Sequence, residues 1–74
     1  MPKLHSSRAV VHVIEKHGFH FVSQRGSHAK YRKGASGSGK TITVIVQMGR
    51  REIPRGTFAS ILRQSQLSEE DFLG

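Results

Sequence analysis

The stretch that most limits how this chain can fold is GASGSGKT, residues 34–41, in which three glycines and two serines separate two runs of strand-forming residues. Its letters match the phosphate-binding pattern G-x-x-x-x-G-K-[ST], which in nucleotide-binding proteins follows a buried strand and opens a helix. Here the run TITVIV, residues 41–46, follows it, and β-branched residues in this pattern favour a strand. The preceding residues 31–33, YRK, carry too much charge for a strand buried on both faces. The stretch is therefore predicted to be the loop of a β-hairpin, and no nucleotide is expected at residues 34–41.

The residues before this loop predict one helix and two strands. Ser6 and Ser7 are favourable N-cap residues, and Gly18 is a favourable helix terminator. Between them an apolar row recurs at helical spacing, and its members are Val10, Val13 and Ile14, with His17 completing it. Residues 19–22 alternate in the manner of a strand, and a turn leads from them into a second strand at residues 27–33.

The residues after the loop predict a third strand and a second helix. Along residues 41–47, alternation directs one set of side chains to the core, namely Ile42, Val44 and Val46. Pro54 marks the start of the helix, with Thr57 as its N-cap. The inward row of this helix is Phe58, Ile61, Leu62 and Ser65. Residues 68–71, SEED, predict a further short helix, and two apolar residues after it are expected to fold back on the core, Phe72 and Leu73.

These elements predict an α+β fold in the order α-β-β-β-α, with a short helix at the C-terminal end. Because the strands are joined by short connections, they are expected to form an antiparallel sheet with both helices on one face. A chain of 74 residues has room for one small core, so a single domain is expected over residues 1–74.

The charge of the chain points to an anionic partner. Twelve Lys and Arg residues against five Asp and Glu residues give a formal net charge of +7. Nucleic acid is the expected partner, and a generic basic domain or an anionic membrane surface are the alternatives. No apolar run approaches the roughly 18 residues of a spanning helix and no signal-peptide pattern opens the chain, so a cytoplasmic protein with no membrane partner is expected. The absence of Cys excludes disulfides, thiolate catalysis and Cys-based zinc sites.

One face of the predicted sheet carries the side chains that could take part in a reaction. Alternation places Ala29 and Tyr31 on the core face, and it leaves a polar and cationic set on the other face, namely His28, Lys30, Arg32, Thr41 and Thr43. His28 can transfer a proton near neutral pH, and the neighbouring cations disfavour its protonated form and attract a phosphodiester. This set suggests metal-independent cleavage of RNA, whose own 2′-OH supplies the nucleophile. A structural or merely exposed His28, a non-catalytic RNA-binding module and a subunit that acts only through its partner remain alternatives.

A second basic group precedes the second helix. Arg50, Arg51 and Arg55 would lie beside the free N–H groups at the start of that helix, where a phosphate can bind. A solvated basic loop that only improves solubility is the alternative interpretation.

The remaining histidines do not predict a metal site. His12 and His17 are five residues apart, which does not aim two rings at one ion as an i, i+4 pair would. We expect His17 to interact instead with the carbonyl groups at the end of the first helix. No cofactor is expected.

Four short segments resemble the HicA-type mRNA interferase toxins. They are GF at residues 18–19, RGSH at 25–28, EIPRGT at 52–57, and ILRQ at 61–64 with LS at 67–68, and the resemblance extends from about Ser7 to Leu73. Many members of that family have a Pro and a His after the third strand, where this chain has Gln47-Met48-Gly49.

The resemblance implies a fold like that of the double-stranded-RNA-binding domain and an endoribonuclease activity on mRNA. It also implies a HicB-type antitoxin as partner and His28, in the Gly-Ser-His segment, as the catalytic residue. The residues expected to bind RNA around it are Arg25, Ser27, Lys30, Arg32, Arg50, Arg51 and Arg55.

Overall fold

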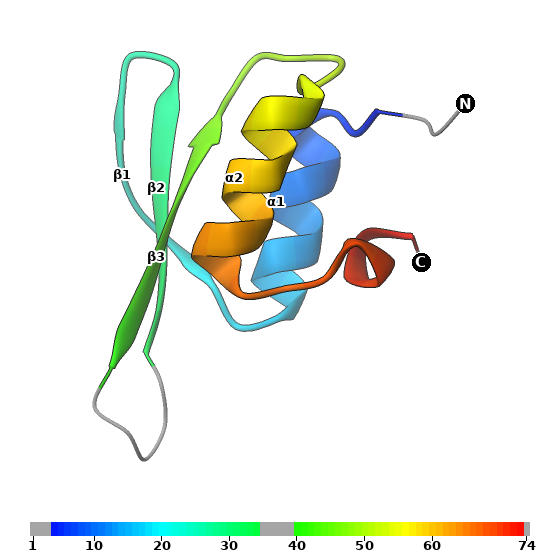
Figure 1. The fold of residues 1–74 in the computed structure, drawn as a ribbon. Helices are drawn as coiled ribbons and strands as arrows, with labels where there is room; N and C mark the ends of the chain where they lie inside the picture. Colours follow the sequence, from blue (N-terminus) through cyan, green and yellow to red (C-terminus); the bar gives the residue numbers. More distant parts are fainter. Residues whose placement is uncertain (1–3, 35–39, 74) are drawn as a thin grey trace.

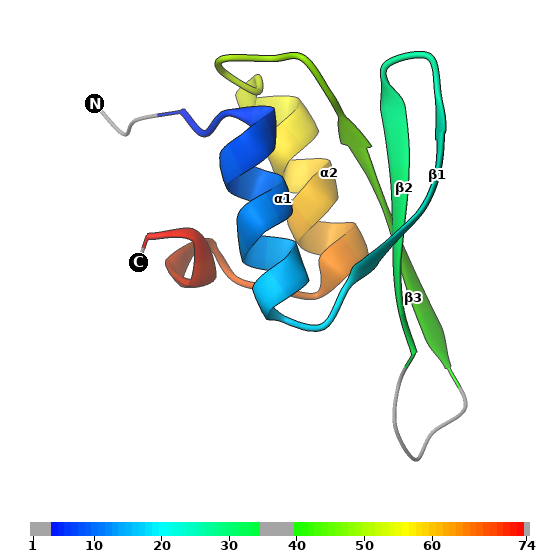
Figure 2. The same ribbon diagram turned by 180° about the vertical axis from the view of Figure 1, so that it is seen from behind.

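The computed structural model describes residues 4–34 and 40–73, in which two helices cover one face of a three-stranded sheet (Figures 1 and 2). The elements follow in the order α1 (Ser7–Lys16), β1 (His20–Arg25), β2 (His28–Gly34), β3 (Thr41–Gln47), α2 (Arg55–Ser65) and a short 3-10 helix, η1 (Glu69–Phe72). The predicted α+β fold with α-β-β-β-α order and a short C-terminal helix is therefore confirmed.

Strand β2 lies in the middle of the sheet and pairs antiparallel with both β1 and β3. Gly34 lies opposite Thr41 at the far end of the β2–β3 pair, as the predicted hairpin requires. The tip of that hairpin, residues 35–39, lies outside the described residues. The element that follows Lys40 is a strand, whereas a nucleotide-binding loop would lead into a helix.

The ends of α1 follow from local hydrogen bonds. The Ser6 side chain accepts a hydrogen bond from the Ala9 N–H at 3.1 Å, so Ser6 is the N-cap. Beyond the helix, Gly18 adopts a φ of +98°, a conformation that costs a glycine little. Nδ1 of His17 lies 2.9 Å from the Val13 carbonyl oxygen, so the predicted interaction of His17 with the end of the helix is confirmed.

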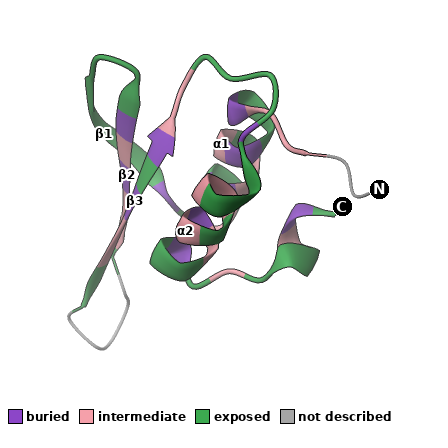
Figure 3. Cartoon of the chain, turned by 45° about the horizontal axis from the view of Figure 1, so that its top comes forward, coloured by how far each residue is buried: buried purple, intermediate pink, exposed green. Residues whose placement is uncertain are grey.

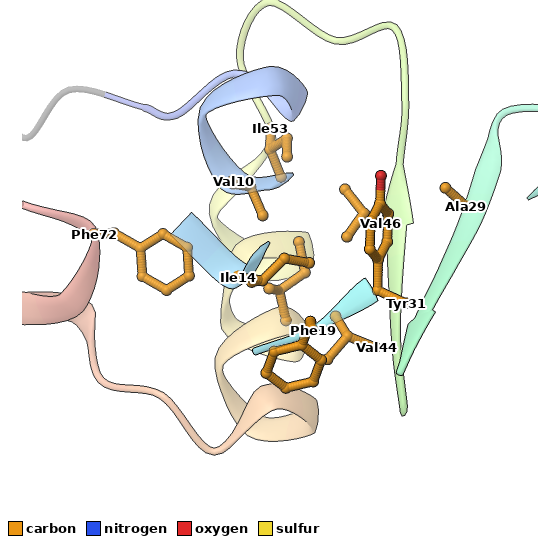
Figure 4. Close-up of a cluster of buried hydrophobic side chains, with 10 residues drawn as sticks. Val10, Ile14, Phe19, Ala29, Tyr31, Val44, Val46, Ile53 and Phe72 are labelled. Atoms are coloured by element: carbon orange, nitrogen blue, oxygen red, sulfur yellow. The ribbon is translucent and has the colours of Figure 1, made fainter. Parts of the chain in front are cut away.

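The core lies between the helices and the sheet (Figure 3), and its side chains come from almost every element (Figure 4). Its buried apolar members are Val10, Ile14, Phe19, Ala29, Tyr31, Val44, Val46, Ile53, Ile61 and Phe72. Burial, and then the charge of Glu15, raise the pKa of the Tyr31 hydroxyl above its ordinary value of 10.0, so this hydroxyl stays protonated. Ile53 lies between the arginines of the second basic group, yet it is fully buried, and its N–H donates to the His5 carbonyl at 2.7 Å.

Two local predictions were wrong. Helix α2 begins at Arg55 with Pro54 as its N-cap, so Thr57 lies inside the helix and does not cap it. The buried Ile53 holds the chain directly before Pro54, and the fixed φ of proline suits the entry to a helix. Leu73 is 74% exposed while Phe72 is buried, because neighbouring residues of a helical turn point in different directions.

Candidate active site

The face of the sheet turned away from the helices, called the open face below, carries the predicted polar side chains. Because Ala29 and Tyr31 of β2 are buried, the residues that alternate with them, His28, Lys30 and Arg32, point to the open face. Strand pairing arranges this face in three rows, which are Arg25–His28–Gln47, Ser23–Lys30–Ile45 and His20–Arg32–Thr43. Side chains directly opposite each other in such rows have Cβ atoms about 4.5–5.5 Å apart.

A bulge in β1 decides which side chain lies beside His28. Phe21 pairs with Tyr31 and Ser23 pairs with Lys30, so Val22 is an extra residue in β1. If β1 paired regularly through Val22, with Val22 opposite Lys30, Gln24 would come opposite His28 and Arg25 would point toward the helices. The bulge therefore places the guanidinium of Arg25, a cation, next to the imidazole.

His28, Arg25 and Lys30 line one surface pocket of about 280 Å³ together with Ser23 and Ile45. His28 is exposed at the first residue of β2, so its ring is accessible to a ligand. No carboxylate lines the pocket, and its charge is that of two permanent cations. Such a pocket can attract a phosphodiester and place it beside a group that can accept a proton.

Ser23 and Ile45 were not among the residues predicted from the sequence to form the site. Alternation along β3 would have placed Ile45 on the open face, because Val44 and Val46 point to the core. Ser23 could not have been found in this way, since the bulge at Val22 reverses the alternation of β1.

The end of the sheet that carries His28 is joined by hydrogen bonds to α1 and to the β3–α2 connection. The Met48 N–H donates to the Ser27 carbonyl at 2.6 Å, which holds the turn before His28. The Ser7 hydroxyl donates to the Gln47 carbonyl at 2.5 Å and accepts from the Arg50 N–H at 3.0 Å. The Ser27 side chain itself is exposed in the turn.

The cationic side chains that were predicted to bind RNA do not lie together in one group. Arg32 shares the open face with His28 but lies two rows away from it. Arg50 and Arg51 line a different pocket at the start of α1, and Arg8, which the sequence analysis missed, lines it with them. Arg55 is exposed in the first turn of α2 and does not line either pocket.

Within residues 4–34 and 40–73, no three His, Cys, Asp or Glu side chains gather where they could hold a metal ion. In the same residues, no helix has the length and apolar character needed to cross a membrane.

One protein family matches the chain. Its description is HicA toxin of bacterial toxin-antitoxin systems, and the match covers residues 7–67, from the first residue of α1 to the turn after α2. No curated protein matches the chain closely enough to serve as a relative.

Proposed function

The chain belongs to the HicA family of bacterial toxins, and from this premise we propose that it is a cytoplasmic endoribonuclease that cuts mRNA at the open face. Membership of a toxin–antitoxin family implies an antitoxin partner. The observation that carries the proposal is the position of His28, exposed in one pocket with Arg25 and Lys30.

In the proposed reaction, the neutral imidazole of His28 accepts the proton of a ribose 2′-OH. The 2′-oxygen forms a bond to the adjacent phosphorus, and the bond from phosphorus to the 5′-oxygen of the next nucleotide breaks. That 5′-oxygen takes a proton from water, because the pocket is open to solvent. The hydroxide that remains takes the proton from His28, so the imidazole is neutral again and water is restored. The products are a 2′,3′-cyclic phosphate and a 5′-hydroxyl end.

Arg25 and Lys30 stabilise the charge that develops on the phosphate oxygens during this step. Both side chains line the pocket of His28, and preorganised cations near a developing oxyanion lower its energy. The other proposed RNA contacts bind the strand outside the reacting bond, and they are Ser27, Arg32, Arg50, Arg51 and Arg55.

The test is cleavage of RNA by the purified protein in excess EDTA. We expect wild-type protein to cut RNA under these conditions and to leave the 2′,3′-cyclic phosphate. RNA binding without cleavage would contradict the proposal and favour a non-catalytic RNA-binding module. A protein that copurifies with its partner and has no RNA affinity of its own would favour a subunit that acts only in the complex.

We also propose that the antitoxin covers the open face. A toxin has to be inactive in its own cell, and an acidic partner surface would mask the pocket of His28 and exclude RNA. Complementary charge would make association fast and sensitive to salt. In a competition assay, antitoxin should displace bound RNA, and a complex that still cleaves RNA would contradict this arrangement.

A further inference from the structure

A second pocket lies beside the start of α1 and is lined by three arginines. It measures about 370 Å³, and its lining residues are Ser6, Ser7, Arg8, Met48, Gly49, Arg50 and Arg51. Arg8 comes from α1, whereas Arg50 and Arg51 come from the β3–α2 connection. Figure 1 shows that connection passing the N-terminal end of α1. The fold therefore gathers cations that are far apart in the sequence.

No acidic side chain shares the pocket with these cations. Among the described residues, no Asp or Glu forms an ion pair with Arg8, Arg50 or Arg51. Three like charges around one hollow repel each other, and this repulsion is relieved when an anion binds between them. The chemistry of the lining therefore selects an anionic group.

The guanidinium of Arg50 also has a hydrogen-bond acceptor beside it. It offers only donors, so the Gln47 side-chain amide is assigned with its oxygen toward it, and in that orientation the oxygen accepts from Nη2 at 3.0 Å and from Nε at 3.2 Å. Three of the five N–H donors of Arg50 stay available for an anion. A fork held in this way loses little entropy when it binds a phosphate.

The pocket lies close to the row of His28. Gln47 is the strand partner of His28, and Arg50 follows Gln47 by three residues. The Cα atoms of His28 and Arg50 are therefore within about 17 Å of each other. A nucleic-acid strand that crosses the open face at His28 can extend to this pocket.

We propose that the pocket of Arg8, Arg50 and Arg51 is a second phosphate-binding subsite, which holds a phosphodiester of the same RNA strand away from the bond that is cut. The proposal rests on the proposed ribonuclease function for the identity of its ligand. The subsite raises the affinity for longer RNA and takes no part in the chemical step.

The experiment measures binding of a short, uncleavable 2′-O-methyl RNA oligonucleotide to the full chain at several salt concentrations. Arg8→Gln and Arg51→Gln should each weaken binding about tenfold and reduce the salt slope by about 0.7. Arg63→Gln is the matched control, because Arg63 is an exposed arginine of α2 whose Nη2 donates to Ser60 Oγ at 3.1 Å. Arg63→Gln should change the affinity and the salt slope much less than the two other substitutions.

A second measurement uses a dinucleotide substrate, whose single phosphodiester cannot fill both pockets at once and can be cut only in the pocket of His28. Its cleavage should be the same for Arg8→Gln and wild type. The proposal would be overturned if the Arg8 and Arg51 variants bound the oligonucleotide as tightly as the Arg63 control. It would also be overturned if these substitutions weakened only the complex with the antitoxin, since the pocket would then bind a protein carboxylate. Failure of the ribonuclease function itself would appear separately, as loss of cleavage by wild type with binding intact.

Discussion

The two faces of strand β2 differ in what their side chains do. Ala29 is fully buried and Tyr31 is 6% exposed, both under the helices, whereas His28 between the turn and Ala29 is exposed to solvent. Neighbouring residues of one strand therefore have different roles. Side chains on the core face determine stability, and those on the open face are available for a ligand at little cost to the fold.

A matched pair of substitutions should give the largest difference between the two faces. Ile14 is fully buried in α1, and Ile45 is 36% exposed on the open face. Ile14→Ala should lower the free energy of unfolding by about 2–5 kcal/mol, because a buried side chain is lost and a cavity remains. Ile45→Ala should lower it by less than about 1 kcal/mol. Urea unfolding measures both, and equal losses would contradict the division into two faces.

Arg25→Gln should remove one cation from the open face without touching the core. Arg25 is the strand partner of His28 and lines the same pocket, so its loss removes a positive charge beside the phosphate. We expect kcat/KM for RNA cleavage to fall about 10- to 100-fold, as for loss of a charged hydrogen bond to the phosphate. Arg63→Gln, at an exposed arginine of α2, is the control. The exposed position of β1 should leave the melting temperature nearly unchanged, and full activity of Arg25→Gln would exclude a role for Arg25.

Arg55→Ala should have a smaller effect, confined to binding. Arg55 lies outside both pockets, so it can contact only the RNA backbone at a distance from the reacting bond. Its loss should reduce the salt slope of RNA binding by about 0.7 and leave the rate at saturating RNA unchanged. A lower rate at saturation would place Arg55 in the chemical step.

Asp71 tests a contact that belongs to neither face of the sheet. The Ser68 backbone N–H donates to Asp71 Oδ2 at 2.8 Å and is the main cause that lowers the pKa of Asp71 below its ordinary value of 3.8. The Ser68 hydroxyl and His17, whose Nε2 lies 3.6 Å from Oδ1, lower it further, and partial burial opposes them. Because the folded-state pKa is lowered, the carboxylate stabilises the fold above the unfolded-state pKa.

Asp71→Asn should therefore lower the melting temperature slightly at neutral pH. The difference from wild type should shrink as the pH falls through the folded-state pKa of Asp71, where the wild-type carboxylate becomes protonated. RNA cleavage should not change. Thermal melts at a series of pH values measure this, and a difference that persists in acid would show that Asp71 acts by packing.

The sequence predicted the fold and the open face because both depend on local periodicity. Alternation in residues 27–33 and 41–47 sorted the strands correctly, and Ser6 and Gly18 delimited α1 as expected. The position of Arg25 depends on pairing between strands, which alternation within one strand does not reveal.

The pocket of Arg8, Arg50 and Arg51 depends in the same way on contacts between distant segments. It requires the β3–α2 connection to lie against α1, and the hydrogen bonds of Ser7 hold it there. Ile53 was missed for a related reason, since it is buried in a core built from distant segments and no pattern in its own segment indicates this.

The most direct test of the central claim measures unfolding and RNA cleavage on the same preparation of His28→Ala. Because His28 lies on the open face, the free energy of unfolding should stay within about 1 kcal/mol of wild type. RNA binding should persist, and cleavage should fall at least about 100-fold, as expected when a general base is removed. Full cleavage by this variant, free of contaminating nuclease, would contradict the account, and so would a loss of activity explained by unfolding.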